Sequence, residues 1–150
     1  IMSLAKALGN GLPIGAMLST EALSSAFGPG SHASTFGGTP LVTAVSKAVL
    51  SSLLNDGRLE HCRNMGNYFM ARLEELKKRH ACIKEVRGLG LIIGVELDRP
   101  GAPVLEACVQ KGFLINCAQE KVLRFVPPLV VTKKEMDQLI EALDAVLGGV

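Results

Sequence analysis

A single lysine near the start of the chain is placed where it could act as a nucleophile. Lys6 is the only charged side chain before Glu21, apolar residues flank it, and Gly9, Gly11 and Gly15 follow closely. Poor solvation disfavours the charged form of an amine, and a neutral lysine can form a Schiff base with an aldehyde. Glycines beside it let the backbone approach a flat ring. On local sequence alone, an ordinary surface lysine extending past apolar neighbours is the more common interpretation.

A loop rich in hydroxyl groups and glycine offers a second kind of chemistry. Ser34 and Thr35 supply hydroxyls, residues 37–38 are both glycine, Thr39 fits a helix N-cap and Pro40 fits the first helical position. The free N–H groups and the dipole at a helix N-terminus both favour a bound anion. An anion site and an ordinary capped loop are about equally consistent with this composition.

Arg124 is the third candidate, because it stands between Leu123 and Phe125 and shortly before two prolines. An unpaired charge is costly to bury among apolar groups. The planar guanidinium can hold a carboxylate through two parallel hydrogen bonds. The alternative is a structural salt bridge with an acidic side chain of the same domain. Arg87, beside Gly88, is a weaker candidate that we expect to be structural.

The composition is that of an ordinary folded domain. Of the 150 residues, 48% are hydrophobic and 20% are charged, and the formal net charge is +2. This excludes extensive disorder, and the scattered basic residues do not suggest a nucleic-acid partner. The four cysteines form no C-x-x-C pair and no metal-ligand spacing, so we predict free thiols in a reducing cytoplasm and no metal site. We also expect no membrane segment and no signal peptide.

The apolar pattern predicts alternating helices and strands. Residues 41–54 are expected to form a buried helix, and residues 58–79 an amphipathic one in which Gly66 indicates a close helix contact. Strand-like stretches follow at residues 81–86 and 89–97, broken at Gly88.

The rest of the chain completes a small α/β sandwich. We predict a helix over residues 104–111 and strands over residues 113–115 and 122–126. A capping box from Thr132 to Glu135 is expected to start a final amphipathic helix. From about residue 81 onward, helices would then pack on a small, largely antiparallel sheet.

Three segments resemble, in the family's order, the active-site segments of the class III aminotransferases, which use pyridoxal 5′-phosphate. Residues 3–16 (SLAKALGNGLPIGA) are similar to the cofactor-lysine segment. Residues 30–41 (GSHASTFGGTPL) resemble the second active-site loop, especially in the acetylornithine branch of the family. Residues 122–129 (VLRFVPPL) resemble the family's Arg-Phe-x-Pro-Pro-Leu segment. Three ordered matches are far more specific than one.

The resemblance implies the C-terminal part of an α/β fold-type I transferase. Residues 1–80 are expected to be the end of the large cofactor-binding domain with its connecting helices, and residues 81–150 the small C-terminal α/β domain. In the family, the acidic partner of the cofactor's ring nitrogen, the stacking aromatic residue and the glycine-rich phosphate turn all precede this region. We therefore expect a longer parent enzyme and negligible activity from these residues alone.

The resemblance also implies residue roles. Lys6 would be the catalytic residue and bind the cofactor, and Thr35 would hold the cofactor phosphate of the neighbouring subunit in a homodimer with shared active sites. Ser34 would contact the amino-acid substrate, and Arg124 its α-carboxylate. In this family the cofactor lysine moves the proton, so we expect a structural role for His32.

The implied reaction is exchange of an amino group between N-acetylornithine and 2-oxoglutarate, as in cytoplasmic arginine biosynthesis. Ornithine, succinylornithine and 4-aminobutyrate are the alternative amino donors. A non-catalytic folding or dimerisation module is the alternative of a different class.

Overall fold

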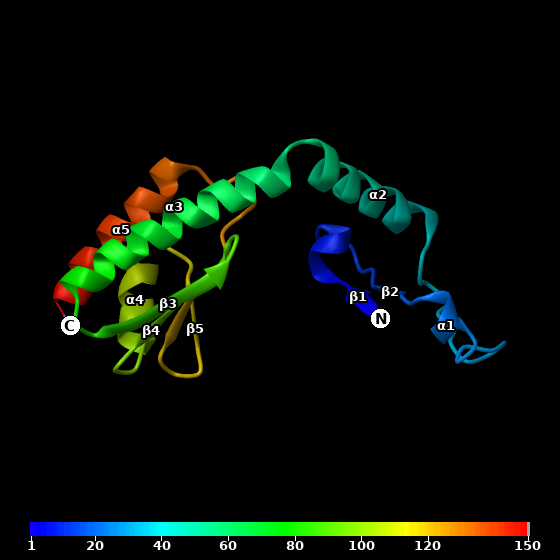
Figure 1. Ribbon diagram of the computed structural model, residues 1–150, viewed down its shortest axis with the longest axis horizontal. Helices are drawn as coiled ribbons and strands as arrows, with labels where there is room; N and C mark the ends of the chain where they lie inside the picture. The colour runs from blue at the N-terminus through cyan, green and yellow to red at the C-terminus, as the bar shows by residue number, and fades with distance from the viewer. Residues whose placement is uncertain (150) are drawn as a thin grey trace. The chain divides into compact units, whose positions relative to one another are not determined.

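The computed structural model describes residues 1–149 and divides the chain after Gly57 into two compact units. The first unit contains β1 (Met2–Leu4), the 3₁₀ turn η1 (Lys6–Gly9), β2 (Ala16–Leu18), α1 (Glu21–Ser24) and α2 (Pro40–Asn55). The second contains α3 (Arg58–Arg79), β3 (Ile83–Leu89), β4 (Ile92–Leu97), α4 (Ala102–Gln110), β5 (Asn116–Ala118), β6 (Val122–Phe125) and α5 (Lys133–Gly148). Figure 1 labels most of these elements along the chain.

In the first unit, a two-stranded ribbon holds the segment that carries Lys6. β1 pairs with β2 in antiparallel register, with Leu4 opposite Ala16, and η1 begins two residues after Leu4. α2 packs against η1. Leu8 of η1 and Val42 of α2 are buried, so the first turns of α2 contribute to this contact.

The prediction that residues 41–54 form a buried helix was right about the helix and wrong about its burial. Only Val42 and Ser46 of α2 are buried, whereas Leu41 and Leu54 are each 69% exposed. η1 is too short to cover a helix that is apolar on several sides. A helix of that composition is normally surrounded by other parts of a protein.

The second unit is a four-stranded antiparallel sheet in the order β3–β4–β6–β5, with helices on one face. α3 and α5 lie side by side, and α4 packs against α5 (Figure 1). α3 contacts β3, β4 and α5, so it packs with the sheet that follows it. The division expected at residue 80 remains a prediction about the domains of a longer protein.

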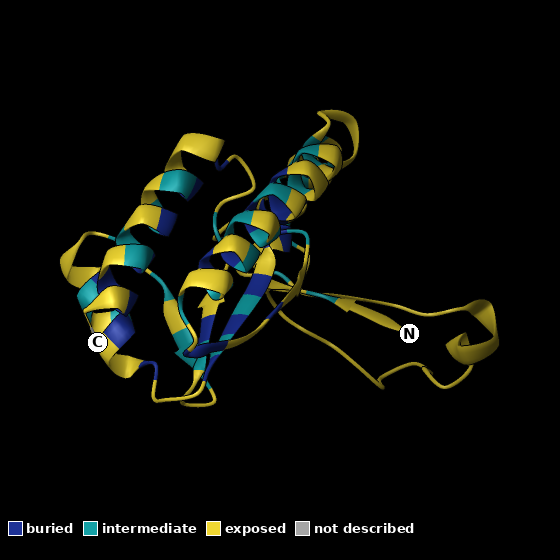
Figure 2. Ribbon diagram, turned by 60° about the vertical axis from the view of Figure 1, so that its left-hand side comes forward, coloured by how far each residue is buried: buried dark blue, intermediate teal, exposed yellow. Residues whose placement is uncertain are grey.

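The core of this unit lies between the helices and one face of the sheet, where Figure 2 shows dark blue residues on the inner sides of both. Alternate strand residues such as Ile93, Val95 and Leu123 point into it, as the period of two along a strand requires. Phe69 of α3 meets Phe125 of β6 edge to face, with ring centroids 5.5 Å apart. The other face of the sheet carries exposed and half-buried residues.

Two strand positions differ from the prediction. Gly88 lies inside β3, and the hairpin turn falls instead at residues 90–91, where Gly90 has φ +56°. Gly88 is needed within the strand because a Cβ there would come 2.4 Å from the carbonyl oxygen of Ile92. Residues 113–115 are not a strand, because the Phe113 amide still bonds the Cys108 carbonyl at the end of α4 (2.9 Å). β5 starts only at Asn116.

The capping box is confirmed. The Thr132 hydroxyl accepts a hydrogen bond from the Glu135 amide (3.3 Å), and the Glu135 carboxylate accepts one from the Thr132 amide (2.8 Å). These bonds satisfy donors that the first turn of α5 would otherwise leave unpaired. The Thr132 hydroxyl also donates to the Glu135 carboxylate (2.7 Å), and this bond, followed by the one from the Thr132 amide, lowers the pKa of the Glu135 carboxyl below its usual value.

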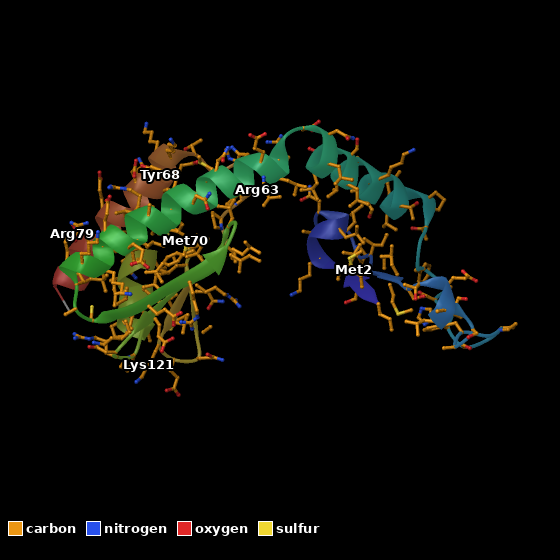
Figure 3. The ribbon with its side chains drawn as sticks, in the orientation of Figure 1. Met2, Arg63, Tyr68, Met70, Arg79 and Lys121 are labelled. Carbon is orange, nitrogen blue, oxygen red and sulfur yellow. The ribbon has the colours of Figure 1, made fainter. Side chains whose placement is uncertain are left out.

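Polar contacts join α3 to α5 at two places. The Tyr68 hydroxyl donates to the Asp137 carboxylate (2.7 Å to Oδ1), which lies between Tyr68 and Arg72. Near the other end of the pair, Asp144 bonds both Arg79 and His80. Tyr68 and Arg79 are labelled on α3 in Figure 3. All four cysteines are free thiols, as predicted.

Candidate active site

Lys6 sits at a strained point of the backbone. Its φ of +52° lies in the left-handed region, which long side chains rarely occupy. The strain costs on the order of 1–3 kcal/mol, and such residues concentrate at functional sites. Asn10 and Gly11 also have positive φ, so the whole turn around η1 is sharply folded.

The amine of Lys6 is available rather than sheltered. The residue is exposed, and no ion pair or hydrogen bond of its side chain is recorded among residues 1–149. The expectation that neighbouring apolar residues leave it poorly solvated is therefore wrong for this chain. Of those neighbours, Leu8 is buried, whereas Ala5 and Ala7 on either side of Lys6 are exposed as well. Water would have to be excluded by groups other than these.

The hydroxyl-rich loop ends at a helix N-terminus with free donors. α2 has Pro40 at its first position, and the Thr39 side chain makes no capping hydrogen bond. The amides that follow therefore lack the usual side-chain acceptor. Thr39 instead accepts two bonds through its carbonyl oxygen, from the amide and the hydroxyl of Thr43.

Ser34 and Thr35 are exposed in this loop, and glycine holds the backbone close to one of them. A Cβ on Gly37 would lie 2.9 Å from both Cβ and Oγ of Ser34, so only glycine fits there without a shift. Gly38 has φ +70° and carries the chain into α2. Phe36, between the hydroxyls and the glycines, is 82% exposed. His32 is exposed as well. The structural role expected for it stays a prediction.

In the second unit, Arg124 lies on the open face of the sheet. It alternates with the buried Leu123 and Phe125 and is itself exposed. No salt bridge to an acidic residue is recorded for it within the described residues. The alternative of a structural ion pair therefore finds no support in this unit. The Arg124 guanidinium can donate two hydrogen bonds to a bound carboxylate.

Arg87 pairs with two acidic side chains of β3 and β4. Its guanidinium lies 2.6 Å from Glu96 and 2.8 Å from Glu85. These bonds raise the pKa of Arg87 further, chiefly through the hydrogen bond to Glu96. Arg87 is thus engaged in the structural pairing that the sequence suggested for it.

The sheet register reveals two neighbours of Arg124 that the motif search missed. Gly94 of β4 and Asn116 of β5 lie directly opposite Arg124, one on each side. Asn116 is exposed, and Gly94 offers no side chain to crowd the guanidinium. The strand pairing needed to find them was not available from the sequence, because β5 was predicted three residues too early.

A mainly apolar pocket lies near the end of β6, apart from the polar candidate residues described above. A pocket of about 270 Å³ lies between α5 and the segments around Phe113 and Pro127. Its lining is mainly apolar, and its one carboxylate, Glu135, already belongs to the capping box. This pocket therefore offers no cation or free amine for a charged amino acid.

Two further possibilities find no support in the part of the chain that the structure covers. No group of three or more His, Cys, Asp or Glu side chains there is arranged to hold a metal ion. None of the helices described is both long and apolar enough to cross a membrane.

Comparison with known proteins places these features in a family. The family profile "Aminotransferase class-III" matches residues 1–147. The acetylornithine aminotransferase of Caldanaerobacter subterraneus subsp. tengcongensis is 49% identical over 152 aligned residues, covering 100% of this chain and 38% of that protein. The ornithine aminotransferase of an Exiguobacterium species is 46% identical over 97% of this chain and 36% of its own length.

Solved structures agree. The acetylornithine aminotransferase of Elizabethkingia anophelis covers 99% of the chain with a TM-score of 0.89 and 28% identity, over 40% of that structure. An ornithine aminotransferase of Toxoplasma gondii, described with partial occupancy of pyridoxal phosphate at its active site, has a TM-score of 0.90 and 30% identity. The match covers 99% of this chain and 36% of the Toxoplasma gondii chain.

This chain therefore belongs to the class III aminotransferase family. The match along residues 1–147 confirms the resemblance seen in three segments, and the solved structures confirm the expected fold class. The chain spans less than half the length of these relatives.

Proposed function

We propose that these residues are the C-terminal part of an acetylornithine aminotransferase, an enzyme that exchanges an amino group between N-acetylornithine and 2-oxoglutarate in arginine biosynthesis. The observation that carries the proposal is Lys6, an exposed amine on a left-handed backbone with no hydrogen-bond or ion-pair partner among residues 1–149. It lies in the segment that resembles the family's cofactor-lysine segment. Acetylornithine aminotransferases are also prominent among the similar proteins.

The donor groups of the first unit fit pyridoxal phosphate. Lys6 supplies the primary amine that an aldehyde requires, and Thr35 and the α2 N-terminus supply donors suited to the phosphate of the cofactor in the partner subunit. When bound, the cofactor supplies an electron sink for the substrate carbon. Lys6 Nζ then takes up and returns the substrate proton as general base and acid.

Ser34 and Arg124 are proposed to bind the amino-acid substrate. The Ser34 hydroxyl is exposed next to Gly37, and the Arg124 fork is free for a carboxylate. Arginine suits this task because it binds both carboxylate oxygens in one plane.

We propose further that the enzyme is a cytoplasmic homodimer in which the loop with Thr35 serves the partner's site. Phe27 and Phe36 of this loop are more than half exposed, which fits a surface that another chain or another part of the protein covers. The free thiols fit a reducing compartment. Because the chain spans 38% of a similar enzyme, we expect it to be inactive by itself.

A spectroscopic comparison tests the role of Lys6 in the full-length protein. The wild type should show a borohydride-sensitive absorbance band with pyridoxal phosphate, and Lys6→Ala should lose it. Lys47→Ala, which removes an exposed lysine from α2, should keep it. A folded wild type that ignores the cofactor would instead support a non-catalytic folding or dimerisation module.

Ornithine is the second candidate substrate, because an ornithine aminotransferase is nearly as similar, at 46% against 49% identity. The ratio of kcat/KM for N-acetylornithine and ornithine, measured at the same 2-oxoglutarate concentration, decides between them. Succinylornithine and 4-aminobutyrate belong in the same panel. A higher kcat/KM for any of these three would replace the substrate proposed here.

A further inference from the structure

The open face of the sheet carries a row of four residues that cross it from edge to edge. Arg87 of β3 is opposite Gly94 of β4, Gly94 is opposite Arg124 of β6, and Arg124 is opposite Asn116 of β5. Directly opposed residues have Cβ atoms about 4.5–5.5 Å apart, close enough for their side chains to meet. Asn116 is therefore the nearest polar neighbour of Arg124 along this row.

Of the two arginines in this row, only Arg87 has an acidic partner within the described residues. Arg87 is held by Glu85 and Glu96. Arg124 and Asn116 are both exposed, and no hydrogen bond of either side chain is recorded in the part of the chain that is described. Gly94 adds no side chain of its own between the two arginines, and a Cβ there would lie 3.2 Å from Cγ1 of Val122.

An amide is the side chain that complements a guanidinium with a carboxylate bound to it. The guanidinium has five N–H donors and no acceptor, and a bidentate carboxylate uses two of them. The Asn116 oxygen can accept from a remaining N–H, while its NH₂ group donates to a carboxylate oxygen. An aspartate at this position could only accept, and it would compete with the substrate for Arg124.

We propose that Asn116 is a second carboxylate-binding residue, acting with Arg124 on the substrate α-carboxylate; this rests on the role proposed for Arg124 above. Asn116 donates one hydrogen bond to the carboxylate and orients the guanidinium that holds it. Its effect is on substrate binding, because an amide that holds a carboxylate takes no part in moving the proton.

The test uses the full-length enzyme with Asn116→Ala and Asn116→Asp, and Asn67→Asp as the matched control. Asn67 is exposed on α3, which packs against the sheet face opposite this row, so the same added charge acts elsewhere. Steady-state kinetics give KM and kcat for both substrates. Calorimetric titration with glutarate, an unreactive dicarboxylate, gives affinity independently of turnover.

Losing a hydrogen bond to a charged group should weaken glutarate binding about tenfold in Asn116→Ala. KM should rise similarly with kcat nearly unchanged, and Asn116→Asp should be affected more strongly. The melting temperature should match that of the wild type, since the side chain is exposed; if Asn116→Asp fails to fold, the Ala variant decides.

Wild-type affinity in both Asn116 variants overturns the inference. The Arg124→Gln variant distinguishes a failure of the role inferred for Asn116 from a failure of the role proposed for Arg124. If Arg124→Gln loses glutarate and the Asn116 variants do not, Arg124 keeps its proposed role and Asn116 has none. If Arg124→Gln binds glutarate like the wild type, the proposed carboxylate site itself is wrong.

Discussion

Gly66 of α3 lies so close to Gly90 in the β3–β4 turn that a Cβ on Gly66 would come 2.2 Å from the Gly90 carbonyl oxygen. The sequence indicated a close contact at Gly66, and the structure shows that its partner is a turn rather than a helix. The helix therefore rests on the hairpin through backbone atoms, with no space for a methyl group.

Gly66→Ala should destabilise the full-length protein, although alanine favours helices by about 1 kcal/mol over glycine. Overpacking against backbone costs about 1–3 kcal/mol or more, so we expect a net loss of about 2 kcal/mol. Denaturant unfolding measures it. Gly148→Ala in α5 is the control, because a Cβ there would lie 3.9 Å from His80, an ordinary contact. Equal stability of the two variants would contradict the close contact.

Thr132→Ala should remove the N-cap of α5 and cost about 1 kcal/mol of stability. The loss arises because the Glu135 amide loses its acceptor and the Glu135 carboxylate loses the hydroxyl donor at 2.7 Å. Thermal unfolding is the measurement, with Thr132→Ser as the variant that keeps the cap. If Ser and Ala destabilise equally, the hydroxyl is not what stabilises the helix.

Asp144 should make the α3–α5 contact sensitive to acid. Its bond with His80, followed by that with Arg79, lowers the pKa of the carboxyl below its usual value. A lowered pKa means that the stabilisation is present above the unfolded pKa and is lost as the pH falls through the folded one. The stability difference between wild type and Asp144→Asn should therefore be fully present well above about pH 4, shrink as the pH falls below it, and vanish only below the lowered pKa of the folded state.

The control for Asp144 is Glu141→Gln, which removes an exposed carboxylate from the same helix. Its stability difference from the wild type should stay small at every pH. A difference for Asp144→Asn that persists unchanged into acid would show that the carboxylate charge does not matter.

Arg124→Lys should raise the KM of the carboxylate substrates by at least about tenfold with a smaller change in kcat, because lysine keeps the charge and loses the fork. Initial-rate kinetics on the full-length enzyme test this. Arg63→Lys on α3 makes the same change at an exposed position of another element and should have no effect. Unaltered kinetics for Arg124→Lys would exclude bidentate binding.

Local signals predicted much of the second unit. The apolar period of α3 and the capping box of α5 are properties of neighbouring residues, and both are found where the sequence indicated. The hairpin turn was misplaced to Gly88 because a glycine required by a close cross-strand approach looks the same in sequence as a turn glycine. β5 was placed too early because the apolar residues after Gly112 look strand-like, whereas the Phe113 amide still bonds the Cys108 carbonyl and closes the end of α4.

The candidate site was only partly predictable. Lys6, Ser34, Thr35 and Arg124 were identified through family segments, and their roles stay predictions. Asn116 and Gly94 could be found only from the strand register, which sequence spacing does not reveal. The exposure of Lys6 was missed because an apolar sequence does not ensure burial: Ala5 and Ala7 beside it are exposed too.

Locating the covalent attachment of the cofactor tests the central claim most directly. The full-length protein is loaded with pyridoxal phosphate, reduced with borohydride, digested and mapped by mass spectrometry. We predict that the label is found on Lys6. A label on any other lysine, or none on a folded protein, would contradict it.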